Sequence, residues 1–112
     1  MPKPVYVSGK KELIETIGRN YDNKIVFMFT AKWCGPCKKM KGLLESEWSD
    51  NNPNVSVLYV DIDDTENEDI LCDFEVESVP TFVINKIDNG KLVKLHTFSG
   101  ADMGMLEQLL NK

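Results

Sequence analysis

Hydrophobic residues along this chain switch between strand-like and helix-like spacing. Short apolar or β-branched runs at residues 4–7, 25–30, 55–62 and 79–84 are typical of β-strands. Between these runs, apolar residues recur every three or four positions, which is typical of amphipathic helices. No linker, repeat or low-complexity tract interrupts the pattern. It therefore predicts one α/β domain over residues 1–112, with the order β-α-β-α-β-α-β-β-α.

Four helical segments are predicted. The first closes at residues 20–23, the second runs from about residue 34 to 48, and the third begins with a capping box formed by Thr65 and Glu68. Their apolar faces are expected to comprise Leu13, Ile14, Ile17 and Tyr21; Met40, Leu43, Leu44 and Trp48; Ile70, Leu71 and Phe74; and, in the last helix, Met103, Leu106 and Leu110.

A hairpin is predicted near the C-terminus. Asp88, Asn89 and Gly90 form a strong turn sequence, and residues 91–98 follow it as the last strand. The turn places this strand beside the run at 79–84.

Composition limits the classes of function. The 112 residues carry a formal net charge of −5 and a pI near 4.8, which argues against nonspecific binding to nucleic acid or an anionic membrane. Three cysteines are too few for a secreted disulfide framework. No apolar run is long enough to span a membrane, and no signal-peptide core follows the start. We therefore expect a cytoplasmic protein with protein partners, in monomeric form.

Two cysteines lie where a strand gives way to a helix. Residues 33–38 read Trp-Cys-Gly-Pro-Cys-Lys. If Cys34 caps or opens the helix, unpaired amides and the helix dipole favour its thiolate, which is the nucleophilic form. Cys37 lies one turn further on, close enough to attack a mixed disulfide formed at Cys34, so that the pair transfers two electrons as a unit. Pro36 needs no amide donor in the first turn, and Gly35 leaves room for a second chain.

Other interpretations of the cysteines remain open. The pair is alternatively a permanent disulfide, or part of a zinc site with Cys72 and His96, although these last two lack paired ligand spacing. Cys72 is expected to pack as a small residue on the third helix, with a regulatory or dimer-forming thiol as the alternative. His96 is expected at the surface of a strand.

The Trp-Cys-Gly-Pro-Cys motif, the Val79-Pro80-Thr81 segment and the late Phe-Ser-Gly-Ala at residues 98–101 together resemble the thioredoxin family over nearly the whole chain. The resemblance implies a thioredoxin fold, with a central mixed sheet flanked by helices. It also implies a protein disulfide reductase that needs no bound cofactor or metal. Electrons would come from an NADPH-dependent thioredoxin reductase and would leave to disulfides in client proteins.

The same resemblance implies roles for single residues. Cys34 is the attacking cysteine and Cys37 the resolving one. The client-docking surface comprises Trp33, Gly35, Pro36, the cis-proline segment Val79-Pro80, and Gly100. Asp63 resembles the acidic residue that supports the active-site tryptophan.

The chain departs from the family pattern beneath the cysteine pair. Six residues before the first cysteine the family usually has a buried aspartate, and here Met28 occupies that position; Tyr59 replaces the lysine that commonly accompanies it. Methionine cannot exchange a proton, so Cys37 is expected to lose its proton to water or to the leaving thiolate. The missing anion should also ease ionisation of Cys34. In addition, Gly42 stands where the family often has a helix-kinking proline.

Two alternatives to a reductase remain. A disulfide oxidase or isomerase is disfavoured by Gly35-Pro36, because oxidising relatives typically carry histidine before the second cysteine. A binding module or stabilising subunit, in which the thiols are secondary, belongs to a different class of function.

Overall fold

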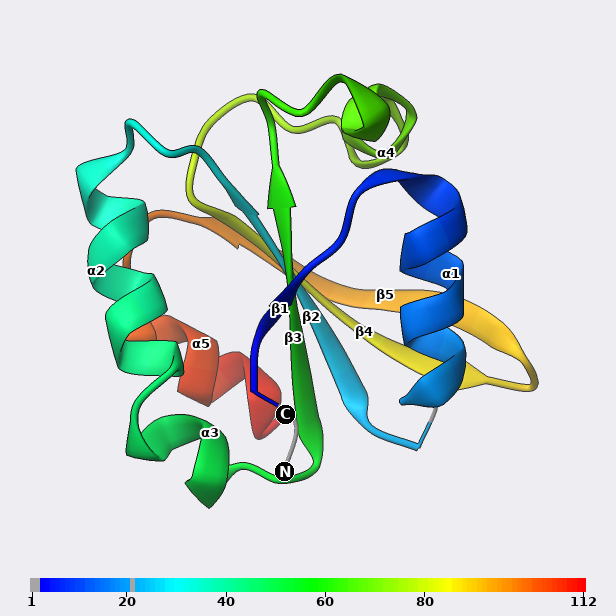
Figure 1. Cartoon of the computed structure of the whole chain (residues 1–112). Coiled ribbons are helices and arrows are strands. Elements are labelled where there is room, and N and C mark those ends of the chain that lie inside the picture. The colour runs from blue at the N-terminus through cyan, green and yellow to red at the C-terminus, as the bar shows by residue number, and fades with distance from the viewer. Residues whose placement is uncertain (1–2, 21) are drawn as a thin grey trace.

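The computed structural model describes residues 3–20 and 22–112. Within this part, five strands form one mixed sheet in the order β1-β3-β2-β4-β5 (Figure 1). The first three strands along the chain are parallel, and the last two are antiparallel to their neighbours. The strands are β1 (Val5–Tyr6), β2 (Lys24–Thr30), β3 (Val55–Asp61), β4 (Thr81–Asp88) and β5 (Lys91–Ser99). The expected mixed sheet is confirmed.

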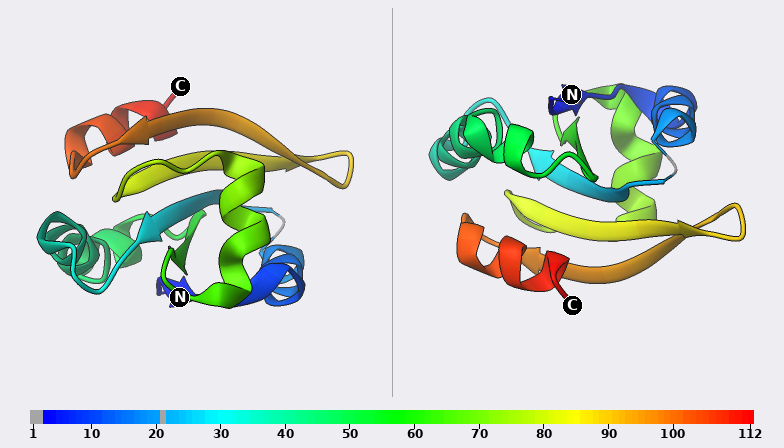
Figure 2. Two further views of the ribbon diagram at one scale, coloured as in Figure 1. Left: turned by 90° about the horizontal axis from the view of Figure 1, so that it is seen from above. Right: turned by 90° about the horizontal axis from the view of Figure 1, so that it is seen from below.

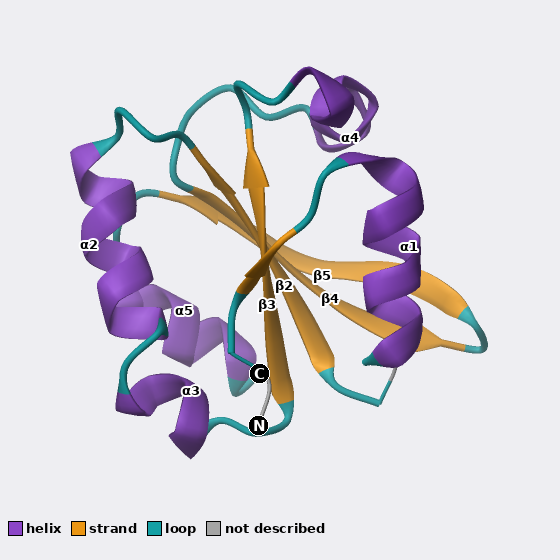
Figure 3. Cartoon of the chain, in the orientation of Figure 1, coloured by secondary structure: helices purple, strands orange, loops and turns teal. Residues whose placement is uncertain are grey.

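Helices cover both faces of this sheet, as the views in Figures 2 and 3 show. Helices α1 (Gly9–Arg19) and α4 (Glu68–Phe74) lie on one face, and α2 (Gly35–Leu44) and α5 (Met103–Leu110) on the other. None of the helices in residues 3–20 and 22–112 is long and apolar enough to cross a membrane.

Alternating residues of the central strand β2 supply both cores. Val26 and Met28 face α2 and α5, and their core also contains Cys34 and Cys37. Phe27 and its odd-numbered neighbours in β2 face α1 and α4. All residues from Ile25 to Phe29 are fully buried, as a central strand covered on both sides requires. The disulfide pair is therefore part of the packed interior beneath α2.

The predicted helix from residue 34 to 48 is in fact two helices. Helix α2 ends at Leu44, and a short helix α3 (Glu47–Asn51) follows. Ser46, between them, has an extended backbone, and its hydroxyl donates to the carbonyl of Leu43 at 2.6 Å. A serine that binds a carbonyl of the preceding turn competes with the helical hydrogen bonds, which accounts for the break.

The expected capping box at Thr65 and Glu68 is wrong. Thr65 lies inside a short 3-10 turn, η1 (Thr65–Asn67), which precedes α4. The residue that caps this turn is Asp64, whose carboxylate accepts from the amide of Glu66 at 3.0 Å and from the Ser8 hydroxyl at 2.7 Å. The Ser8 hydrogen bond, followed by the Glu66 amide, lowers the pKa of Asp64.

Two apolar residues expected on buried helix faces are exposed. Ile14 is 65% exposed and Leu43 is 42% exposed. The buried positions of α1 are Leu13 and Thr16 and those of α2 include Met40 and Leu44, so the helical rotation turns Ile14 and Leu43 away from the core. The placement of Tyr21 lies outside the described residues.

The predicted hairpin is confirmed: Asn89 and Gly90 both have positive φ, of 53° and 75°, as the two-residue turn between β4 and β5 requires.

Candidate active site

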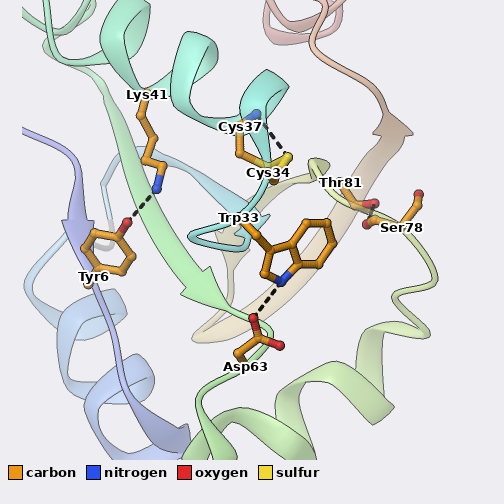
Figure 4. The surroundings of a disulfide bond; sticks show 8 residues. All are labelled: Tyr6, Trp33, Cys34, Cys37, Lys41, Asp63, Ser78 and Thr81. Atoms are coloured by element: carbon orange, nitrogen blue, oxygen red, sulfur yellow. Dashed lines mark hydrogen bonds between the residues drawn. A yellow bond between two sulfur atoms is a disulfide. The ribbon is translucent and has the colours of Figure 1, made fainter.

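The two cysteines of the motif are joined as a disulfide at the start of α2 (Figure 4). Cys34 is the N-cap residue of the helix, and its Sγ accepts a hydrogen bond from the amide of Cys37 at 3.1 Å. Their Cα atoms lie 5.2 Å apart. In the reduced protein, an amide and a helix N-terminus directed at Cys34 Sγ favour the thiolate. The expected capping position is thus confirmed.

The two cysteines differ in exposure. Cys34 is 4% exposed, whereas Cys37 is fully buried. Gly35, between them, is exposed, and a Cβ there would meet no atom within 4 Å. Pro36 lies in the first turn, where its missing amide has no helical acceptor to lose. An incoming sulfur therefore reaches Cys34 before Cys37.

A second segment of the site precedes β4. The peptide bond between Val79 and Pro80 is cis, in agreement with the resemblance. The amide of Gly100, which follows β5, donates to the carbonyl of Pro80 at 2.9 Å. Gly100 has a φ of 105°, a conformation that favours glycine. Two segments that are 20 residues apart in the sequence are in this way held side by side.

A hydroxyl network fixes the same segment. The Thr81 hydroxyl donates to the carbonyl of Ser78 at 2.6 Å (Figure 4). The same hydroxyl lies 3.0 Å from the Ser99 hydroxyl. These side chains were not predicted as site residues. Threonine and serine are common in strands, and only the pairing of β4 with β5 brings the two hydroxyls together.

Trp33 forms an exposed aromatic surface beside the disulfide. Its indole is 68% exposed, and its Nε1 donates to Asp63 Oδ2 at 2.8 Å (Figure 4). The contact implied by the resemblance between Asp63 and this tryptophan is confirmed. Because the hydrogen bond is to a carboxylate, it holds the indole in one orientation without covering it.

Beneath the pair, the carboxylate position of the family is apolar. Met28 is fully buried in the core that contains Cys34 and Cys37, and its neighbours across the sheet are Tyr59 and Phe82. Tyr59 replaces the lysine, and position 28 offers it no charged side chain as a partner. Its hydroxyl donates to Glu45 Oε2 at 2.6 Å, at the far end of α2 from the disulfide.

Tyr59 should resist ionisation in alkaline solution. Burial, and then the hydrogen bond to Glu45, raise the pKa of this phenol. Its contribution to stability is therefore complete below the ordinary tyrosine pKa of about 10 and is lost as pH rises above that value. We expect Tyr59→Phe to cost about 1–3 kcal/mol at pH 7 and to weaken the alkaline loss of stability. Denaturant unfolding from pH 7 to 11 measures both effects; an equally steep alkaline loss in both proteins would contradict this assignment.

Lys41 forms a further unpredicted contact on this side of α2. Its Nζ donates to the Tyr6 hydroxyl at 2.6 Å (Figure 4). The same atom lies 5.6 Å from the centre of the Tyr59 ring. The periodicity of α2 marked this lysine only as polar. Its partner is 35 residues away in the sequence, so no local pattern reveals the contact.

The residues of the zinc alternative lie on separate elements. His96 is on β5 and Cys72 is on α4, whereas Cys34 and Cys37 are bonded to each other. Within residues 3–20 and 22–112, no group of three or more His, Cys, Asp or Glu side chains is placed to hold a metal ion. Cys72 lies on the expected helix, α4, but as an exposed free thiol, so the expectation that it packs there as a small residue is wrong.

The parts of the site define a class of protein. A mixed sheet with helices on both faces, a Cys-Gly-Pro-Cys pair at a helix N-terminus and a cis-proline segment that precedes an antiparallel strand together make a thiol-disulfide oxidoreductase with the thioredoxin fold.

Comparison with known proteins agrees with this class. The Thioredoxin family profile matches residues 5–112. Rat thioredoxin is 36% identical over 106 residues, which cover 95% of this chain and 94% of that protein. The X-ray structure of Fasciola hepatica thioredoxin is 32% identical, with a TM-score of 0.79 over 99% of this chain and 97% of that one. Trichomonas vaginalis thioredoxin, at 24% identity, shares the fold with a TM-score of 0.83, over 99% and 98% of the two chains. The chain belongs to the thioredoxin family.

Proposed function

We propose that this protein reduces disulfides in client proteins and is itself reduced by an NADPH-dependent thioredoxin reductase. The observation that carries the proposal is the placement of Cys34 Sγ at the helix N-terminus, 3.1 Å from the amide of Cys37. That placement favours the thiolate needed for attack. The reducing direction is supported by Gly35-Pro36 between the cysteines, and relatives such as rat thioredoxin support the choice of reductase.

The reaction proceeds in two exchanges. The Cys34 thiolate attacks one sulfur of the client disulfide, so that a mixed disulfide forms and the other client sulfur leaves as a thiolate. Cys37 then loses its proton, and its thiolate attacks Cys34 Sγ. The Cys34–Cys37 disulfide forms, the client's second thiolate leaves, and two electrons have moved from protein to client. The reductase then returns two electrons to the pair.

The client lies across the surface next to Cys34. Trp33 and Gly35-Pro36 form one side of the docking surface, and Val79-Pro80 and Gly100 form the other. The contact between Gly100 and Pro80 supports this grouping, since it keeps both segments together. The backbone of Val79 pairs with the extended client chain. Asp63 acts through Trp33, and Met28 lines the apolar floor beneath the pair.

We extend the proposal to the domain and its cellular setting. Residues 1–112 form one domain, which the family profile over residues 5–112 supports. The protein works as a monomer in the cytoplasm, where it contributes to electron transport and redox homeostasis. It needs no bound cofactor, because the redox-active disulfide itself carries the electrons.

NADPH-coupled reduction of insulin tests the proposal. We expect NADPH oxidation that requires this protein, a thioredoxin reductase and insulin together. If the reductase reduces the Cys34–Cys37 pair but insulin stays oxidised, the general reductase function is wrong. Biological function retained by a Cys34→Ser, Cys37→Ser double variant would instead favour the binding module.

A further inference from the structure

An open hollow lies beside Trp33, the residue that precedes Cys34. It has a volume of about 250 Å³ and is lined by Trp33, Ile62, Leu71, Val76, Val79 and the 77–78 segment. The aliphatic lining residues are each half-buried, so part of every side chain faces the hollow. The floor is thus apolar, and one wall is the exposed indole of Trp33.

Carboxylates flank this hollow. Glu77 is the one charged residue in its lining, and it is exposed. Asp63 holds the indole wall through the 2.8 Å hydrogen bond, which adds a second negative charge beside the ring. The charge of Lys32 helps to lower the pKa of Asp64, and this lysine is in neither of the salt bridges of the described residues. Within residues 3–20 and 22–112, the salt bridges are Lys3 with Asp50 and Lys10 with Asp73, so Glu77 has no cationic partner there.

The walls of the hollow are fixed by hydrogen bonds. Asp63 orients Trp33 on one side, and on the other the Thr81 hydroxyl holds the carbonyl of Ser78, next to Glu77 (Figure 4). Both walls are therefore already held in place before a client side chain enters the hollow. Preformed sites of this kind lose less affinity to conformational entropy than mobile ones.

We infer that this hollow receives an arginine or lysine side chain of the client, located within two residues of the client's disulfide cysteine. Both side chains have an apolar stem and a cationic end, which match the apolar floor and the carboxylates. The exposed indole face of Trp33 also attracts a cation, and more strongly an arginine. The limit of two residues follows because an extended chain advances about 3.3 Å per residue and the hollow begins at Trp33, beside Cys34.

The inference rests on the proposed disulfide reduction and adds a client preference to it. The test uses short disulfide-bonded peptides that differ at one position near the cysteine, which is arginine, methionine or glutamate. The position is varied from two residues before the cysteine to two after it. We expect the wild-type protein to reduce the best arginine peptide about fivefold faster, in kcat/KM, than its methionine counterpart. This ratio should fall as salt concentration rises.

Variants at Glu77 make the assignment specific. Glu77→Gln should reduce the preference for the arginine peptide over the methionine peptide to about twofold. Glu77→Lys should make the glutamate peptide a better substrate than the arginine peptide. Glu47→Gln serves as the matched control, because Glu47 is an exposed carboxylate on α3, at the far end of α2 from the disulfide. It should retain the wild-type preference.

The outcomes separate this inference from the proposed function. If the wild-type protein reduces the arginine and methionine peptides at equal rates, the preference is wrong and the reductase function stands. An arginine preference that is the same in Glu77→Lys also overturns the inference. If no peptide is reduced, both the proposed function and the client preference fail.

Discussion

Replacing Cys37 with serine should turn the protein into a covalent trap for its clients. Cys34 still attacks the client disulfide from the helix N-terminus, but the sulfur that completes the exchange is gone. Steady-state reduction is expected to fall by about a thousandfold or more, and a mixed disulfide with the client should accumulate. Non-reducing electrophoresis or mass spectrometry detects the adduct, which a dithiol reductant should release.

Cys34→Ser is the matched variant. It should lose turnover to a similar extent and form no adduct, because Cys37 is fully buried and cannot meet the client. Cys72→Ser controls for the exposed thiol on α4 and should behave like the wild-type protein. An adduct formed through Cys72, or turnover that survives in Cys34→Ser, would show that the roles of the cysteines are assigned wrongly.

Met28→Asp should make both protein stability and the cysteine reactions depend on pH in a new way. In the wild-type protein this position holds a methionine, which does not titrate. Met28 is fully buried in the core that contains both cysteines, and Tyr59 beside it is committed to Glu45. An aspartate there would have no cationic partner, so burial would raise its pKa above the ordinary value of about 4. We expect the variant to be less stable at pH 7 by about 3–5 kcal/mol.

The sign of the pH effect follows from that raised pKa. The variant is most stable when the carboxyl is protonated, and it loses stability as pH rises from about 4 through the folded-state pKa. Above that pKa the new anion should slow attack by Cys34, because it disfavours a second nearby anion, and should assist deprotonation of Cys37. Stopped-flow measurements of mixed-disulfide formation and resolution from pH 5 to 9 separate the two steps.

Met28→Asn is the control for this prediction. Asparagine has the shape of aspartate but carries no charge. Met28→Asn should therefore lose stability to the same extent at every pH and should add no titration to the formation or resolution of the mixed disulfide. Identical pH profiles for the wild-type protein and Met28→Asp would mean that this position does not influence proton transfer at the cysteine pair.

Much of the fold could be predicted because the sequence pattern is local. The apolar run in β2, the turn at Asn89-Gly90 and the helix start at Cys34 each depend on neighbouring residues, and all three are as expected. The predictions were wrong where a single side chain determines where a helix ends or a turn begins. The hydroxyl of Ser46 ends the helix earlier than its apolar spacing indicates, and Asp64 caps the turn that Thr65 was expected to begin.

The site was predictable where the resemblance carried it and not elsewhere. The cysteine pair, the cis-proline segment and the Trp33–Asp63 contact were expected from the motifs. The hollow beside Trp33 was not, because its lining comes from Ile62, which follows β3, from α4 and from the 76–79 segment, and only the fold brings these together. The bond between Tyr59 and Glu45 likewise depends on how α2 lies over the sheet.

The most direct test of the central claim is an electron count in a single turnover. Fully reduced protein is mixed with an excess of insulin in the absence of reductase, and thiols and disulfides are then assigned in both proteins by mass spectrometry. We predict that each chain acquires one Cys34–Cys37 disulfide and that one insulin disulfide opens for each such bond formed, with Cys72 still free. An oxidised pair without an opened client disulfide, or an opened client disulfide while Cys34 and Cys37 remain thiols, would contradict the proposed exchange.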